Sequence, residues 1–169
     1  MSEESKALAF ATLLPGACGA AGMAAILTDK TDYWGWYKGL KRPAWAIPGN
    51  CALYAHSAID MACMTPLAYA TTLVWKHGGG PDYNDTKAAL ASYASLFGLG
   101  VLFIPAMKHK SLKALTLLTA GMTANGLLTA HLYYNIHEKA GYLALPFCAF
   151  AAYYTLMILR MWDLNEKHD

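Results

Sequence analysis

The sequence predicts an all-α membrane protein, a bundle of five transmembrane helices in a single domain. Of its 169 residues, 56% are hydrophobic and only 14% are charged, against roughly 25% charged residues in soluble domains. The apolar residues gather in five segments, each long enough for the roughly 20 residues that cross a bilayer as a helix. These segments are too long for membrane strands and lack the alternation of a barrel, which favours helices. We expect helices at about 7–28, 51–75, 88–107, 111–134 and 141–162 of the domain 1–169, joined after the first by a long loop, 29–50.

The first two expected helices differ in polarity. The first carries no charged residue, and small residues at Gly16 and Gly19 would let another helix backbone approach closely. The second contains two ionisable residues, His56 and Asp60, and we expect a kink at Pro66 because proline removes a helix hydrogen bond.

The remaining three expected helices are apolar with a few polar positions. The third contains Gly98 and Gly100, and the fourth contains Asn125 and His131. Such polar residues inside a membrane helix are more often hydrogen-bond partners of a neighbouring helix than ligand contacts. The fifth ends in a polar tail, 163–169.

The long first loop has an unusual composition between Trp36 and Pro48. It combines aromatic rings, prolines and three cations. Pro43 and Pro48 forbid a continuous helix there. Tryptophan and tyrosine beside lysine and arginine are typical of a membrane–water interface. We therefore expect this loop to lie over one end of the bundle.

The cations predict the orientation of the bundle, because cytosolic loops of membrane proteins are enriched in lysine and arginine. Five passes place the two termini on opposite sides of the membrane. The side with the N-terminus carries Lys6, Lys76, Lys87 and Lys139. The side with the C-terminus carries the larger set of Lys30, Lys38, Lys41, Arg42, Lys108, Lys110, Lys113, Arg160 and Lys167. We expect the C-terminus and the first loop to face the cytosol.

Charge and cysteine patterns exclude several function classes. The net charge is only +2, which argues against a nucleic-acid partner. The four cysteines are widely spaced and form no C-x-x-C pair, so neither a metal site nor a redox pair is expected. The sequence contains no arrangement of nucleophile, base and acid that would indicate hydrolytic chemistry.

Several motifs together carry a family resemblance. The loop reads Trp36-Tyr37-x-x-Leu40-x-Arg42-Pro43-x-Trp45-x-x-Pro48, and the other motifs are Pro15-Gly16, Val74-Trp75-Lys76, Tyr93, Pro105, Leu145-Pro146-Phe147 and Trp162-x-x-Asn165. This pattern resembles the translocator protein family, TspO/MBR, also called the tryptophan-rich sensory proteins. The loop motif is specific, with Arg42 standing where the family usually has lysine, and the other matches are diffuse.

The resemblance implies a helical bundle in the mitochondrial outer membrane, often dimeric, that binds porphyrins and sterols among its five helices. It implies a role as a receptor linked to sterol or tetrapyrrole transport, with the first loop as a lid over the pocket. Implied partners are membrane lipids and sterol, porphyrin or heme as ligand, a second copy of the chain and a voltage-dependent anion channel. No cofactor is required.

This chain departs from the family at pocket tryptophans. Phe150 stands where the family usually has tryptophan, and the stretch 60–68 lacks the usual tryptophan and tyrosine. The third helix reads Leu99-Gly100-Val101-Leu102-Phe103-Ile104-Pro105 instead of the family's L-N-W-x-W-P. Some bacterial members are thought to degrade porphyrin with these tryptophans, so we expect a binding protein rather than an enzyme. A porphyrin-degrading or stress-protective enzyme and a membrane adaptor are the alternatives.

His56 and Asp60 are the candidate ligand contacts that the residues themselves indicate. They are four residues apart and share one helix face. An ionisable side chain at membrane depth is a functional candidate, because charge in hydrocarbon is costly. A polar pair facing another helix, or an aspartate that stays neutral, is an equally good interpretation. Two such residues make a poor metal site, so no metal is expected.

The lid offers a second group of candidate contacts: Trp36, Lys41, Arg42, Pro43, Trp45 and Pro48. In one interpretation Trp45, held between two prolines, closes the pocket, and Lys41 or Arg42 pairs with porphyrin propionates. In the other interpretation the rings are simple interfacial anchors.

The resemblance also implies further ligand positions within the helices: Ile26, Ala114, Phe150, Tyr154 and Met157. For sterol it indicates Tyr153, Tyr154, Leu159 and Arg160 in the fifth helix. The sterol motif of the family is degraded there, because no leucine or valine lies close enough before Tyr154. The patterns Leu128–Tyr133–Lys139 and Lys139–Tyr142–Leu145 match sterol motifs that also occur by chance.

Overall fold

The fold of the chain is entirely helical in the described residues. The computed structural model describes residues 2–28, 32–49 and 51–166, without the side chains of residues 23, 26, 27, 53 and 54. No strand occurs in these ranges, which confirms the all-α prediction there. The helices are α1 (Glu3–Leu27), α2 (Tyr33–Gly39), α3 (Ala52–His77), α4 (Asn84–Lys108), α5 (Leu112–Ile136) and α6 (Glu138–Glu166).

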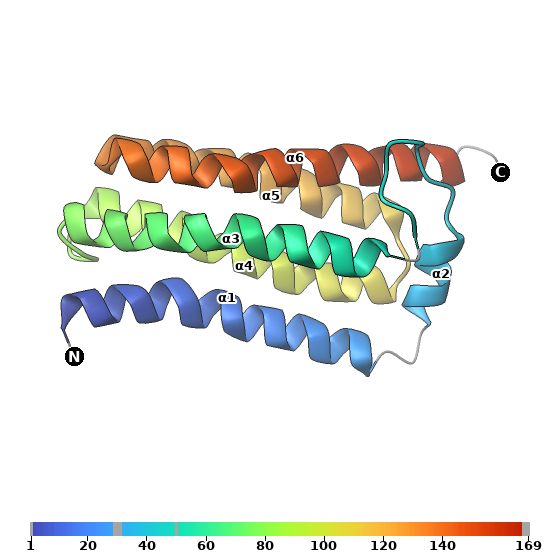
Figure 1. Ribbon diagram of the computed structural model, residues 1–169, viewed down its shortest axis with the longest axis horizontal. Coiled ribbons are helices and arrows are strands. Elements are labelled where there is room, and N and C mark those ends of the chain that lie inside the picture. The colour runs from blue at the N-terminus through green and yellow to red at the C-terminus, as the bar shows by residue number, and fades with distance from the viewer. Residues whose placement is uncertain (1, 29–31, 50, 167–169) are drawn as a thin grey trace.

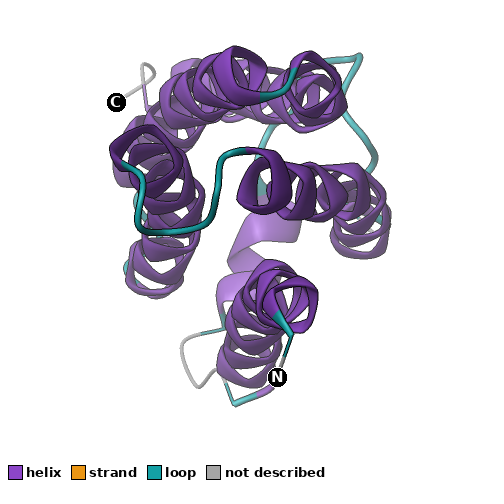
Figure 2. Cartoon of the chain, turned by 90° about the vertical axis from the view of Figure 1, so that its left-hand side faces the viewer, coloured by secondary structure: helices purple, strands orange, loops and turns teal. Residues whose placement is uncertain are grey.

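The five long helices run side by side, and the short α2 lies across one end of them (Figure 1). The N-terminal helix starts at the opposite end from α2, whereas α6 ends beside it. Viewed end-on, the helices form a ring (Figure 2). In this ring α1 contacts α3 and α4, α6 lies between α3 and α5, and α5 contacts α4.

The core consists of two buried clusters. The first, far from α2, contains Leu67, Tyr93, Tyr133 and Phe147 and joins α3, α4, α5 and α6. The second lies at the α2 end of the bundle. It is made of Tyr33, Tyr37, Ala52, Ala106, Leu112, Leu115, Met157, Ile158 and Met161. Burial of these apolar side chains, at about 25 cal/mol per Å², holds α2 onto the ends of the long helices.

Three glycines permit close approaches of the backbone at two places in the fold. Gly79 and Gly80 lie in the α3–α4 turn with φ of 79° and 82°, a region that other residues rarely adopt. Gly141 lies where α6 meets α5. A Cβ there would be 2.6 Å from the Cβ of Tyr134, so only glycine allows this close approach.

The helix α2 lies inside the segment that the sequence led us to expect as a loop, 29–50. Asp32 caps its start, because a carboxylate oxygen accepts a hydrogen bond from the Gly35 amide at 3.1 Å. The prolines exclude a helix only further along. From residue 40 the chain is irregular, with turns closed by Ala46 N to Pro43 O at 3.0 Å and Cys51 N to Pro48 O at 3.1 Å. We call α2 together with residues 40–49 the lid.

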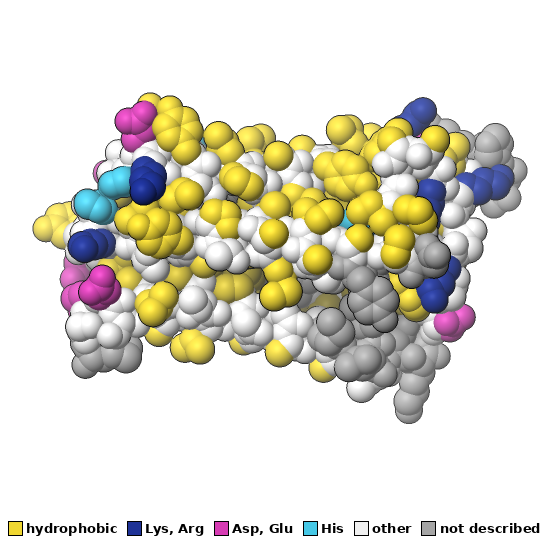
Figure 3. All heavy atoms as spheres, in the orientation of Figure 1, with side chains coloured by type: hydrophobic (Ala, Val, Ile, Leu, Met, Phe, Trp, Pro, Cys, Tyr) yellow, Lys and Arg dark blue, Asp and Glu magenta, His cyan; other side chains and the backbone are white. Residues whose placement is uncertain are grey.

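Two helices of the described chain, α4 and α6, are long and apolar enough to cross a membrane. On the face shown in Figure 3, charged side chains lie at the two ends of the molecule and hydrophobic side chains cover the middle. This distribution is the one a membrane-spanning bundle presents to lipid.

Candidate functional site

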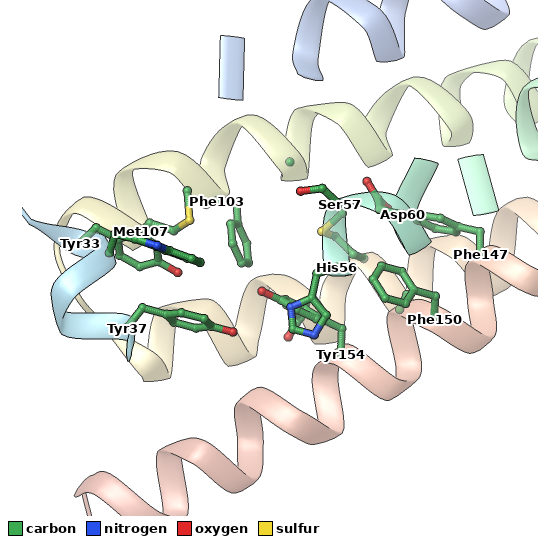
Figure 4. Close-up of a pocket in the computed structure, with 15 residues that line it drawn as sticks. Tyr33, Tyr37, His56, Ser57, Asp60, Phe103, Met107, Phe147, Phe150 and Tyr154 are labelled. Carbon is green, nitrogen blue, oxygen red and sulfur yellow. The ribbon is translucent and has the colours of Figure 1, made fainter. Parts of the chain in front are cut away.

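A cavity of about 280 Å³ lies beneath α2, with walls formed by α2 and the four long helices α3–α6 (Figure 4). Each of these five helices contributes to its wall. The lining residues are Tyr33, Trp34 and Tyr37 of α2, His56, Ser57 and Asp60 of α3, Gly100, Phe103 and Met107 of α4, Thr119 and Met122 of α5, and Phe147, Phe150, Ala151 and Tyr154 of α6.

The lid contributes three aromatic rings to the wall. Tyr33 and Tyr37 are one helical turn apart and buried, with ring centroids 5.6 Å apart. Trp34 stacks on Tyr37 at 5.4 Å. Burial, with a smaller contribution from Tyr37, raises the pKa of the Tyr33 phenol above its ordinary value. The lid end of the cavity is therefore an apolar aromatic surface that includes the protonated phenol of Tyr33.

Arg42 fastens the irregular part of the lid to α2. Its Nη2 donates a hydrogen bond to the carbonyl oxygen of Tyr37 at 2.7 Å, and its guanidinium lies 4.3 Å from the centroid of the Tyr37 ring. Its Nε and Nη1 are buried and have no hydrogen-bond partner among the described residues. Unpaired buried donors of this kind are costly in the free protein, and they are of the type that donates hydrogen bonds to an anionic group.

Lys41 ties the lid to the C-terminal helix through its backbone. The amide of Lys41 donates to Oδ1 of Asn165 at 3.0 Å, and Nδ2 of Asn165 donates to the carbonyl oxygen of Lys41 at 2.9 Å. Because α6 forms the opposite wall of the cavity, this pair fixes the lid relative to that wall.

His56 and Asp60 lie one turn apart on α3, and both line the cavity. The His56 side chain is only 9% exposed, and its Nε2 has no hydrogen-bond partner within the described part of the chain. Asp60 is exposed. Its side chain is therefore both part of the cavity wall and accessible from the surface of the bundle.

The aromatic wall of α6 faces His56. The His56 ring meets Tyr154 edge-on, with centroids 5.0 Å apart. Phe150 lies 6.0 Å from Tyr154 and 6.4 Å from His56, measured between centroids. The sequence places Phe150 and Tyr154 one turn apart, so both rings point to the same side of α6 (Figure 4).

The site can hold an apolar, ring-containing molecule and orient it with a few polar groups. Aromatic rings line much of its wall. Besides the phenol and indole groups of these rings, the polar side chains of the wall are His56, Asp60, Ser57 and Thr119. Ligand cavities in proteins typically measure about 300–1,000 Å³ and share this character. Among the described residues there is no group of three or more side chains that could hold a metal ion.

Comparison with known proteins identifies the family. The model of the TspO/MBR family matches residues 11–163. The chain belongs to this family. The Translocator protein of Ovis aries is 27% identical to it over 159 residues, which cover 92% of this chain and 88% of the sheep protein. The Translocator protein of Bos taurus is 26% identical over the same shares. The resemblance stated from the sequence motifs is thereby confirmed.

The TspO/MBR loop motif forms the lid, but only part of it reaches the cavity. Tyr37 lines the wall, whereas Trp36 packs beside the second core cluster. Trp45 is 52% exposed and does not line the cavity; its ring meets Tyr153 edge-on at 5.6 Å. Pro43 and Pro48 close the two turns of the lid. In this arrangement the rings above the cavity come from α2.

Of the predicted ligand positions in the helices, four line the cavity: His56, Asp60, Phe150 and Tyr154. Met157 is fully buried in the second core cluster, and Ala114 packs against that cluster. The side chain of Ile26 lies outside the described residues.

The sterol positions predicted on α6 are dispersed. Tyr153 is half-buried between Trp45 and His56, and Leu159 is half-buried. Arg160 is exposed, and its Nη1 lies 3.5 Å from Oδ2 of Asp163. Of the four residues, therefore, Tyr154 lines the cavity and the other three do not.

Sequence reasoning missed several wall residues of this TspO/MBR chain. Tyr33 was missed because it precedes the loop motif, and Trp34 was interpreted only as a possible interfacial anchor. Tyr33 and Tyr37 nevertheless have the four-residue spacing of a helix face behind a capping aspartate. Phe103, Met107 and Met122 sit in apolar helices, where no local signal separates a wall residue from one that faces lipid.

Proposed function

We propose that this TspO/MBR chain is a membrane receptor that binds hydrophobic small molecules in the cavity beneath α2. The observation that carries the proposal is the cavity itself, lined by rings from the lid and from α4 and α6, with a few polar groups on α3. An apolar pocket with convergent polar groups is the usual form of a small-molecule site.

Porphyrin or heme and cholesterol-like sterols are the ligand classes we propose. A flat ring system can stack on Tyr37, Phe150 and Tyr154. The unpartnered nitrogens of Arg42 offer donors to porphyrin propionates, and the unpartnered Nε2 of His56 offers a hydrogen bond to a sterol hydroxyl. At about 280 Å³ the cavity is small for either ligand, so we propose that the lid moves outward when they bind.

We further propose that all five long helices cross the membrane. They have 25 to 29 residues each, and at about 1.5 Å per residue each exceeds the roughly 30 Å of hydrocarbon in a bilayer. We place the lid and the C-terminus on the cytosolic side of the mitochondrial outer membrane. The cations Lys38, Lys41, Arg42, Lys108, Lys110, Lys113 and Arg160, on the lid, the α4–α5 connection and the end of α6, support this orientation.

We propose binding without catalysis. The long helices contribute Phe103, Phe147 and Phe150 to the wall, and Trp34 of the lid is the one tryptophan among the described lining residues. We further propose that the chain forms a dimer, contacts a voltage-dependent anion channel and takes part in sterol or tetrapyrrole transport. Crosslinking in native membranes tests the two contacts, and transfer assays test transport.

Titration of the purified, folded protein with protoporphyrin IX and with cholesterol tests the central proposal. We expect saturable binding of at least one of them, with mutual displacement if both share the cavity. Illumination of the complex with protoporphyrin IX tests the alternative that the chain degrades porphyrin as an enzyme. If products form and their formation depends on Trp34, the chain is an enzyme rather than a receptor. If neither ligand binds saturably, the proposed ligand classes are refuted.

A further inference from the structure

Asp60 gives the cavity wall its charge. Among the 15 residues that line the cavity, it is the one side chain with a formal charge at neutral pH when His56 is neutral. Arg42 and Lys41 are not part of the wall. Within the wall an anionic ligand group would therefore meet a carboxylate, and a propionate would reach the Arg42 donors only when the lid has moved, whereas a cationic group would meet its counter-charge at Asp60.

The Asp60 carboxylate has no partner in the part of the chain that the structure describes. The ion pairs there are Lys6–Glu3 and Arg160–Asp163, at opposite ends of the bundle. None of the hydrogen bonds among the described residues involves the side-chain carboxylate of Asp60. A carboxylate against apolar walls without a counter-ion is unfavourable, and a ligand that supplies the cation removes that cost.

The surroundings of Asp60 fit a cation in two further ways. Tyr37, Phe103, Phe150 and Tyr154 present rings around the same cavity, and aromatic faces attract ammonium groups within about 6 Å. His56 Nε2, buried and unpartnered one turn away, is a second acceptor for an ammonium N–H when the imidazole is protonated on Nδ1.

We infer that the cavity selects lipophilic aromatic amines, with the ammonium at Asp60 and the ring system among the aromatic side chains. This inference rests on the proposed binding of hydrophobic small molecules and adds the charge class of the preferred ligand. Because Asp60 is exposed as well as part of the cavity wall, an ammonium group can reach the carboxylate without displacement of the lid.

A matched pair of probes tests the inference on the full chain in nanodiscs of neutral lipid at pH 7. The amine is N,N-dimethyl-1-naphthylmethylamine, and its neutral carbon isostere is 1-isobutylnaphthalene. Affinities are measured by naphthalene fluorescence and corrected with protein-free nanodiscs. We expect the wild type to bind the amine at least tenfold more tightly than the hydrocarbon. Equal affinities, or binding of neither probe, would overturn the inference and leave the proposed function standing, because that function is tested separately by titration with protoporphyrin IX and cholesterol.

Variants locate the preference. Asp60→Asn is expected to reduce the amine-to-hydrocarbon preference to within twofold of unity while the hydrocarbon affinity stays within twofold of wild type. Asp60→Glu keeps the charge and should keep the preference for the amine. If the asparagine variant does not fold, loss of the preference in a folded glutamate variant would still contradict the assignment. Asp85→Asn, in the first turn of α4 and outside the cavity, is the control and should behave as wild type. A preference that survives Asp60→Asn in folded protein would overturn the assignment.

Discussion

The side-chain amide of Asn165 pairs with both backbone groups of Lys41, 124 residues earlier in the chain. Its oxygen accepts from the Lys41 amide at 3.0 Å, and its nitrogen donates to the Lys41 carbonyl at 2.9 Å and to the Met161 carbonyl at 2.7 Å. One residue of α6 thus holds the irregular part of the lid in register with the wall of the cavity.

Asn165→Ala should release the lid. Two hydrogen bonds at about 0.5–1.5 kcal/mol each are lost, so we expect the equilibrium constant for lid opening to rise about 5- to 150-fold. Hydrogen exchange of residues 40–49 should accelerate, and bound ligand should dissociate faster. Asn135→Ala is the control, because Asn135 is exposed and contacts only His131 among the described side chains. Unchanged exchange in Asn165→Ala would contradict the role of this pair.

Arg42→Ala should separate the two proposed ligand classes. Loss of the guanidinium removes the donors for propionates, worth about 1.5–3 kcal/mol for a charged hydrogen bond, and we expect at least tenfold weaker binding of protoporphyrin IX. The Tyr37 ring stays in the wall, so cholesterol affinity should change much less. Lys108→Ala, at the end of α4, is the control. Equal losses for both ligands would indicate a general collapse of the lid instead.

Gly141→Ala should destabilise the contact between α5 and α6. The added methyl group would lie 2.6 Å from the Cβ and 2.8 Å from the Cα of Tyr134, and backbone cannot move aside cheaply. We expect a loss of about 1–3 kcal/mol, measured by thermal unfolding in detergent. Gly22→Ala meets no atom within 4 Å and should gain up to about 1 kcal/mol from helix propensity. Unchanged thermal stability of the Gly141→Ala variant would show that α5 and α6 are less closely packed than this contact indicates.

Acid should loosen the start of α1 from the end of α3. Hydrogen bonds from Lys6 and then from the Trp75 indole lower the pKa of Glu3 below its ordinary 4.5. Because the pKa of Glu3 is lower in the folded protein, its contact with Trp75 is stabilised at pH values above the ordinary pKa. This stabilisation is lost as the pH falls through the pKa of Glu3 in the folded protein. We expect Trp75 fluorescence to change below about pH 4.5 and Glu3→Gln to remove this transition. A transition that persists in Glu3→Gln would assign it to another group.

Much of the helical architecture could be predicted because long apolar runs leave few alternatives to helices. The missed element, α2, is short. Its two buried tyrosines lie beside a proline-containing loop whose composition dominated the interpretation of 29–50. Helices this short depend on tertiary burial, here in the second core cluster, rather than on a long periodic pattern.

The candidate site could be predicted only in part. His56 and Asp60 stood out because ionisable residues are rare in apolar helices, and Phe150 and Tyr154 came from the family resemblance. Trp45 was expected above the pocket because prolines flank it, but proline spacing constrains local backbone and not the direction in which a loop crosses the bundle. Met157 is one turn from the wall residue Tyr154, and a small rotation of α6 decides which of such neighbours faces a cavity.

Filling the cavity tests the central claim most directly. Gly100 lines the cavity and Gly98 does not, although both lie on α4 and an added Cβ would meet no atom within 4 Å at either position. Leucine at either position favours the helix by roughly 1 kcal/mol relative to glycine, so neither variant should unfold. Equilibrium titration with the tighter-binding of protoporphyrin IX and cholesterol should show at least tenfold weaker binding for Gly100→Leu and wild-type affinity for Gly98→Leu. Wild-type affinity in Gly100→Leu, or equal losses in both variants, would contradict binding beneath α2.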